Sequence, residues 1–276
     1  MIAVCLKWVD QRPDAGVAVG ADIGSLDARF AGVSAADRAA LEWALRCRDA
    51  WAGETVLAVT VGPAQADTVL RDALAAGADR AIRIDAHFGL ASHAAADSIA
   101  ALVGDASLVF CGDYSSDRGS GSVPAFLAIA LGFDQALGLV HLDIGAAASI
   151  QALRQLDGGR RERLAIGAGT VVSVEGSTAL LRRAPLRALL ATAAIDVHPG
   201  PTVAQHRFSS INSRPYRPRP RVLPAPVGAT ALDRVRALTA SGTAAPHGET
   251  VTLEPADAAA RILATLREWG YTPTSL

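Results

Sequence analysis

The chain has 276 residues, half of them apolar, so it is long enough to bury one large core or two modest ones. Its 27 acidic and 26 basic side chains nearly cancel, which excludes a global field that would hold it on nucleic acid or on a membrane surface. Three widely spaced cysteines form no disulfide framework, and no apolar run reaches the roughly 20 residues of a membrane span. We therefore expect a cytoplasmic globular protein with no nucleic acid partner and no stable membrane insertion.

The N-terminal region predicts a strand, a long loop and a helix. Residues 2–6 are a short apolar run typical of a buried strand. The Gly- and Asp-rich stretch 10–32 predicts a long loop with some hairpin character, and loops of that length usually carry function. Ser34, followed three residues later by Asp37, resembles a capping box and opens the helix.

The next segment has the pattern of a β-α-β unit. Residues 56–61 form a β-rich apolar run that ends at Gly62 and Pro63, which cannot continue a strand ladder. An amphipathic helix follows and ends at Gly77, expected to be left-handed, before a second strand at 81–84. Such a unit predicts a parallel sheet, in which ligands bind at the carboxyl ends of the strands.

A second strand and helix flank a loop of small polar residues. After a helix at 91–103, residues 107–111 predict a buried strand that leads into the loop 112–122. Pro124 then suits the first turn of a helix that ends at Gly132. Backbone N–H groups of such a loop, with a helix N-terminus behind them, suit a phosphate. Any strand-to-helix turn collects Gly and Ser, however, and the spacing matches neither a Walker loop nor G-x-G-x-x-G.

Strands dominate the remainder of the core, where Asp157-Gly158-Gly159 predicts a hairpin turn. Strands are expected at residues 137–144, 153–156, 163–166 and 170–174, and a helical stretch near 186–194. The whole pattern predicts a three-layer α/β/α fold with a mostly parallel, Rossmann-like sheet, a hairpin region and an extended C-terminal arm.

The alternating prolines of residues 214–221 mark the end of this core, since they forbid helix and remove backbone donors. We expect a nucleotide-binding domain at 1–212, and at 213–276 an arm with helices at 230–239 and 255–269. The arginines of the arm could suggest RNA binding, but without a run of stacking aromatics a solvated arm or a protein contact fits better.

Nothing in the sequence predicts catalysis by this chain itself. The six histidines do not pair with other ligand types at metal-site spacing, and there is no G-x-S-x-G motif. We therefore expect neither a metal site nor a catalytic residue.

Over residues 1 to about 176, the sequences of several short segments resemble those of the β-subunit of electron transfer flavoproteins. The segments are Gly62-Pro63-Ala64-Gln65, Leu70-Arg71, Ala73-Leu74 and Gly77-Ala78-Asp79-Arg80-Ala81-Ile82. The resemblance implies a heterodimer with an FAD-bearing α-subunit, which the arm embraces. That dimer carries electrons from a dehydrogenase to a membrane quinone reductase of the respiratory chain, with AMP bound structurally in the β-subunit.

The resemblance also implies which residues hold the nucleotide. Gly112 and Asp117 match the family's phosphate loop in place. The expected cofactor-binding set is Cys5, Ser34, Asp37, Val61, Gly112, Asp117, Gly119, Ser120, Gly121, Ser122 and Val123. For Cys5 a small buried strand residue is the ordinary interpretation, and a redox role would require an accessible, activated thiolate.

Departures from the family pattern leave alternatives open. Arg118 and Gly119 stand where acidic residues are usual, and residues 120–124 replace the common Asn-Gln-Thr-Gly, so the cleft could hold AMP or the second FAD of bifurcating relatives. Ala184-Pro185-Leu186 fills the place of the dehydrogenase-recognition loop, without its lysines, so a partner other than an acyl-CoA dehydrogenase is expected. A divergent actinobacterial branch associated with the peptide-derived cofactor mycofactocin is one place for such a chain.

Two other classes of function compete with this interpretation. The first is a free-standing adenine-nucleotide-binding module of the universal-stress kind, which would purify as a homodimer. The second is a nucleotide-dependent enzyme, against which stand the missing glycine fingerprint and the lack of a general base beside the loop.

Overall fold

The structure is a computed structural model. It describes residues 1–11, 28–87, 90–117, 119–145, 149–191, 194–201, 225–226, 228–240 and 251–269. The chain divides into two compact units, Met1–Ser213 and Arg214–Leu276, and each is considered by itself.

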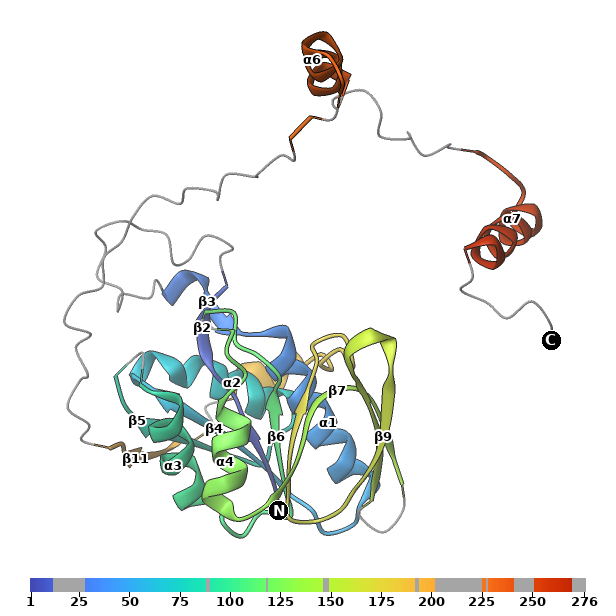
Figure 1. The fold of residues 1–276 in the computed structure, drawn as a ribbon. Coiled ribbons are helices and arrows are strands. Elements are labelled where there is room, and N and C mark those ends of the chain that lie inside the picture. The colour runs from blue at the N-terminus through green and yellow to red at the C-terminus, as the bar shows by residue number, and fades with distance from the viewer. Residues whose placement is uncertain are drawn as a thin grey trace. The chain divides into compact units, whose positions relative to one another are not determined.

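A nine-stranded sheet forms the centre of the first unit, in the order β11-β5-β4-β1-β6-β10-β7-β8-β9 (Figure 1). Pairing is parallel from β11 to β7, and β7, β8 and β9 form an antiparallel meander. The strands are β1 (Ile2–Cys5), β4 (Val56–Gly62), β5 (Arg80–Asp85), β6 (Leu108–Gly112), β7 (Asp134–Ile144), β8 (Ile150–Gln155), β9 (Arg161–Ile166), β10 (Thr170–Val174) and β11 (Asp196–Pro199).

Helices cover both faces of this sheet. Helices α1 (Ala35–Ala50) and α2 (Asp67–Ala76) pack on one face, and α3 (Ser92–Val103) and α4 (Val123–Leu131) on the other. Because successive strand residues point to opposite faces, Ile2 and Val4 of β1 belong to the core under α1, whereas Ala3 and Cys5 belong to the core under α3 and α4. The predicted three-layer α/β/α fold is confirmed.

The predicted hairpins occur in part. Strands β8 and β9 pair antiparallel across the turn Asp157–Gly159, as the Asp-Gly-Gly motif indicated. At the two ends of the stretch 10–32, β2 (Trp8–Asp10) and β3 (Ala31–Val33) form a separate two-stranded antiparallel sheet, and a 3-10 turn at Ala28–Phe30 leads into β3. The remainder, 12–27, lies outside the described residues.

The helix predicted near residues 186–194 is shorter in the structure. Helix α5 covers only Leu186–Leu189, and none of its residues is buried, so no core contact supports a longer helix. The chain enters β11 at Asp196, an edge strand that pairs with β5 and that the sequence did not predict. Gly77 does end α2 with a positive φ, but at +124° it lies outside the expected left-handed helical region.

The described part of the second unit contains α6 (Ala231–Ala240) and α7 (Pro255–Glu268), close to the predicted helices. Both expose apolar side chains, among them Leu232 and Val235 on α6 and Ile262 and Trp269 near α7. The proline-rich segment 214–221 lies outside the described residues. Among the residues that are described, no helix has both the length and the apolar character that crossing a membrane requires.

Candidate functional site

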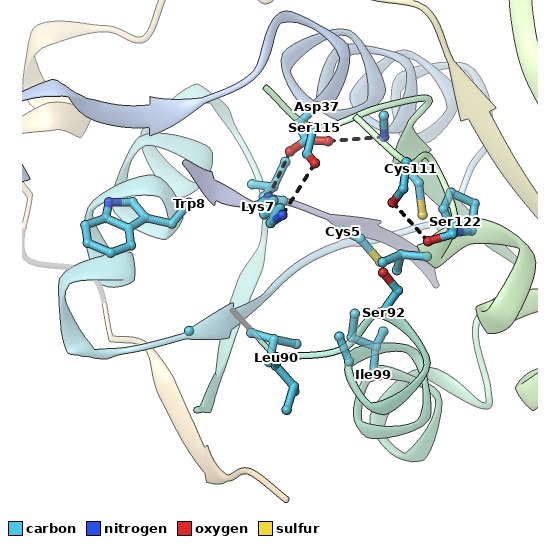
Figure 2. Close-up of a pocket in the computed structure, with 18 of the residues that line it drawn as sticks. Cys5, Lys7, Trp8, Asp37, Leu90, Ser92, Ile99, Cys111, Ser115 and Ser122 are labelled. Atoms are coloured by element: carbon cyan, nitrogen blue, oxygen red, sulfur yellow. Dashed lines mark hydrogen bonds between the residues drawn. The ribbon is translucent and has the colours of Figure 1, made fainter. Parts of the chain in front are cut away.

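A cleft opens at the carboxyl ends of β1, β4 and β6, between the loops that follow these strands (Figure 2). This is where the β-α-β pattern predicted a ligand site. Eight of the eleven predicted site residues line it, namely Cys5, Asp37, Val61, Gly112, Ser120, Gly121, Ser122 and Val123. Of the other three, Ser34 and Asp117 bind residues that line the cleft, and Gly119 shapes its loop.

Asp37 joins three elements at the base of the cleft. Ser34 caps α1 by accepting the backbone N–H of Asp37 at 3.1 Å. The Asp37 carboxylate accepts the backbone N–H of Lys7, just after β1, at 2.8 Å and that of Gly112, at the end of β6, at 3.2 Å. The Asp37 carboxylate therefore fixes the ends of two central strands against a helix N-terminus, a role that the capping-box resemblance did not predict.

Burial controls the ionisation of this carboxylate. The side chain is almost fully enclosed, and desolvation raises the pKa of Asp37 to about 7 against the lowering effect of the Lys7 and Gly112 N–H groups and the Lys7 charge. Asp37 therefore changes its charge close to neutral pH, inside the wall of the cleft.

Gly112 is required by the close approach of β6 to α1. A Cβ at this position would collide with the Asp37 carboxylate and would lie 2.8 Å from the Asp37 backbone nitrogen and 2.9 Å from the Cβ of Ala36. The absence of a side chain therefore allows the Gly112 N–H to reach Asp37.

Lys7 is a cleft residue that sequence reasoning missed as a site candidate. Its ammonium group donates to both carboxylate oxygens of Asp117 at 2.7 Å and lies 3.4 Å from the Ser115 hydroxyl. Asp117 does not line the cleft itself but holds the one lysine of the chain at its rim. The signal was available, because Lys7 follows the first strand directly at its carboxyl end.

The loop between β6 and α4 is shaped by two glycines with positive φ. Gly119 has φ +62° and Gly121 has φ +55°, and a Cβ on Gly121 would collide with the carbonyl oxygen of Asp113. The hydroxyls of Ser120 and Ser122 lie 3.0 Å apart at the start of α4. Serine hydroxyls in front of a helix N-terminus favour an anionic group at this end of the cleft.

The opposite wall of the cleft is largely apolar, with Ser92 as a polar residue in it (Figure 2). Val61, Leu90 and Ile99 line it, and the Trp8 side chain lies at one end (Figure 2). Sequence reasoning had named only Val61 as a site residue. An apolar wall facing a cationic and hydroxyl-rich wall suits a ligand with a flat ring system at one end and a negative charge at the other.

Cys5 and Cys111 lie together on the floor of the cleft, at the ends of β1 and β6. Both are buried and neither is in a disulfide. Within the described residues, no three His, Cys, Asp or Glu side chains gather closely enough to hold a metal ion.

The fold and the cleft define the class: an α/β protein with a ligand cleft at the carboxyl ends of its central parallel strands. The profile of the electron transfer flavoprotein domain matches residues 27–188, more than half of the chain. The chain therefore belongs to the electron transfer flavoprotein family, and the relatives it matches are β-subunits.

Two curated relatives illustrate the similarity. Over 125 residues the chain is 31% identical to the electron transfer flavoprotein subunit beta of Bradyrhizobium diazoefficiens, covering 45% of this chain and 50% of that protein. Over 45 residues it is 56% identical to the mitochondrial electron transfer flavoprotein subunit beta of Oryza sativa subsp. indica, covering 16% of this chain and 18% of the relative. The matched region thus spans at most about half the length of these relatives.

Proposed function

We propose that this chain is the β-subunit of an electron transfer flavoprotein and holds AMP structurally in the cleft. The observation that carries the proposal is the pairing of an apolar wall with Lys7 and the Ser120–Ser122 loop at the N-terminus of α4. The base would pack near Val61 and Ile99, and the phosphate would meet the loop N–H groups and the Lys7 ammonium.

Electron transfer would take place on an FAD shared with an α-subunit, and the chain would act as a carrier subunit without catalytic residues of its own. Family membership supports this role. The C-terminal arm, 213–276, would contact the α-subunit, which gives the exposed apolar side chains of α6 and α7 a surface to pack on.

The donor would be a dehydrogenase, and the acceptor a quinone reductase of the respiratory chain. The segment Ala184-Pro185-Leu186 would meet the dehydrogenase. Leu186 is 71% exposed there and Leu190 is 77% exposed, so apolar side chains are available for a transient contact. The lysines that follow the proline in the family's loop are absent here.

A second FAD in the same cleft is the alternative ligand, favoured by one specific observation. Trp8 lies in the cleft wall, where an indole could stack on an isoalloxazine ring. We favour AMP, because among the described residues of the cleft Trp8 and Tyr114 are the aromatic side chains, and Tyr114 is 51% exposed.

Co-expression with an electron transfer flavoprotein α-subunit from the same genome tests the proposed role. We expect a yellow 1:1 heterodimer from the full chain, and loss of that heterodimer from a truncated chain that ends at residue 212. A matched truncation that removes only residues 270–276 should still assemble, because it keeps α6 and α7. A colourless homodimer that ignores the α-subunit would instead favour the universal-stress type of module.

A further inference from the structure

Cys5 and Cys111 are lateral neighbours on adjacent parallel strands. The register pairs Val4 with Phe110, and the next residue on each strand is the cysteine. Both cysteines contribute to the core under α3 and α4, so their side chains leave the sheet on the same face. Adjacent strands lie about 4.8 Å apart, within the range of Cα separations of about 4.4–6.8 Å that a disulfide spans.

The two thiols also face the same space. Both line the ligand cleft, and Figure 2 shows the two sulfur atoms beside one another on its floor. A ligand seated above them would cover both thiols, including the small area of Cys5 that faces the cleft.

The environments of the two thiols differ, and the difference indicates which thiol reacts first. A hydrogen bond with the Cys5 side chain, together with burial, raises the pKa of Cys111 well above its usual value. Cys111 is 3% exposed and Cys5 is 9% exposed. Cys111 therefore keeps its proton, and Cys5 is the thiol that solutes in the cleft reach first.

The third cysteine provides a control within the same chain. Cys47 lies on α1, in the core on the other face of the sheet, and does not line the cleft. Burial raises the pKa of Cys47 to about 12, and because Cys47 lies away from the cleft a peroxide that enters the cleft would not meet it.

We propose that Cys5 and Cys111 form a redox-active dithiol, which hydroperoxides close to a disulfide and which a ligand in the cleft protects. The Cys5 thiol gives up its proton as its sulfur attacks one peroxide oxygen and the O–O bond breaks; the departing oxygen takes up that proton and leaves as an alcohol or water, and Cys5 is then a sulfenic acid. Cys111 attacks that sulfur, the S–S bond forms, and water leaves with the Cys111 proton. In total two thiols lose two electrons and two protons, and the hydroperoxide is reduced.

The proposal that Cys5 and Cys111 form a dithiol rests on their positions and does not depend on the proposed function. Only protection by AMP rests on the proposed function, so the two parts can fail separately.

Thiol counting and peptide mapping test the dithiol. The reduced full-length chain is treated with hydrogen peroxide, denatured, alkylated and digested for mass spectrometry. We expect loss of two thiols out of three, one peptide pair linked through Cys5 and Cys111, and an alkylated Cys47. The Cys47→Ser variant should lose the same two thiols. Cys111→Ser should form no link and should instead accumulate a sulfenic acid at Cys5 that dimedone traps.

Other outcomes of the same experiment would contradict the proposal. Three free thiols after treatment, a link through Cys47, or disulfide dimers on a non-reducing gel would each overturn the dithiol. In a separate arm, excess AMP should slow disulfide formation at least several-fold. An unchanged rate while the disulfide still forms would leave the dithiol standing and would count against AMP in this cleft.

Discussion

The backbone N–H of Gly112 reaches the carboxylate of Asp37 at 3.2 Å, and this contact joins the end of β6 to the first turn of α1. Any side chain at position 112 would enter the space that the carboxylate occupies. The contact thus depends on the residue type at both ends.

Gly112→Ala should lower the free energy of unfolding by about 1–3 kcal/mol, because overpacking forces α1 away from the sheet. The Cβ has no flexible neighbour that can yield, since it also meets the Asp37 backbone nitrogen at 2.8 Å. Urea denaturation of the purified chain measures the change. Gly167→Ala is the control, because a Cβ there meets nothing within 4 Å, and its change should stay within about 0.5 kcal/mol. Equal effects of the two substitutions would show that the contact to Asp37 is not tight.

Asp37 should make stability fall as the pH rises. Because its pKa is about 7 in the folded protein and 3.8 in the unfolded reference, the folded state holds the proton more tightly. The stabilising contribution is fully present below pH 4, declines between about pH 4 and 7, and is absent above. Asp37→Asn should remove this decline, and one pKa unit corresponds to about 1.4 kcal/mol.

The measurement is the free energy of unfolding of wild type and variant from pH 4 to 8. The difference between them should change by a few kcal/mol between about pH 4 and 7 and level off above pH 7. Asp97→Asn, on the exposed face of α3, is the matched control for the loss of one carboxylate. A wild type that instead gains stability relative to Asp37→Asn as the pH rises would contradict the assignment.

Lys7→Met should weaken nucleotide retention by about tenfold or more, since a hydrogen bond to a charged group contributes about 1.5–3 kcal/mol. Stability should change by less than about 1 kcal/mol, because the Lys7–Asp117 pair is partly exposed, with side chains 39% and 20% accessible. Nucleotide extracted per heterodimer, after dialysis, reports the retention.

Arg80→Met is the matched control for that substitution. It also breaks one ion pair, to Asp196 at 3.3 Å, but between exposed side chains on β5 and β11 that do not line the cleft. Retention that is equal in the two variants would mean that Lys7 does not contact the ligand.

The sequence predicted those parts of the fold that local patterns determine. The β-α-β unit, the Asp-Gly-Gly hairpin and the Pro124 helix start each depend on a few neighbouring residues, and all were found. Strand β11 was missed because its pairing with β5 is non-local, and its exposed residues Asp196 and Val197 carry no apolar run. The helix over 186–194 was overestimated, since apolar composition alone does not show whether a helix has a core to pack on.

The cleft residues likewise divide into those that could be named from sequence and those that only the three-dimensional fold brings together. The small-residue loop could be named from sequence because turn residues have recognisable spacing, whereas Asp37 entered the predicted site only through the family resemblance. The meeting of Lys7 with Asp117, and of Cys5 with Cys111, joins positions more than 100 residues apart. Only the strand order of the sheet brings such positions together, and no local pattern encodes it.

Quantifying the nucleotides released from the denatured heterodimer tests the central claim most directly. Under the proposed function the cleft holds AMP, and in its alternative a second FAD; either would place a phosphate at the Ser120–Ser122 loop, so released flavin per protein separates the two proposals. We predict one FAD and one AMP per heterodimer. Two FAD and no AMP would contradict the assignment of this cleft to AMP.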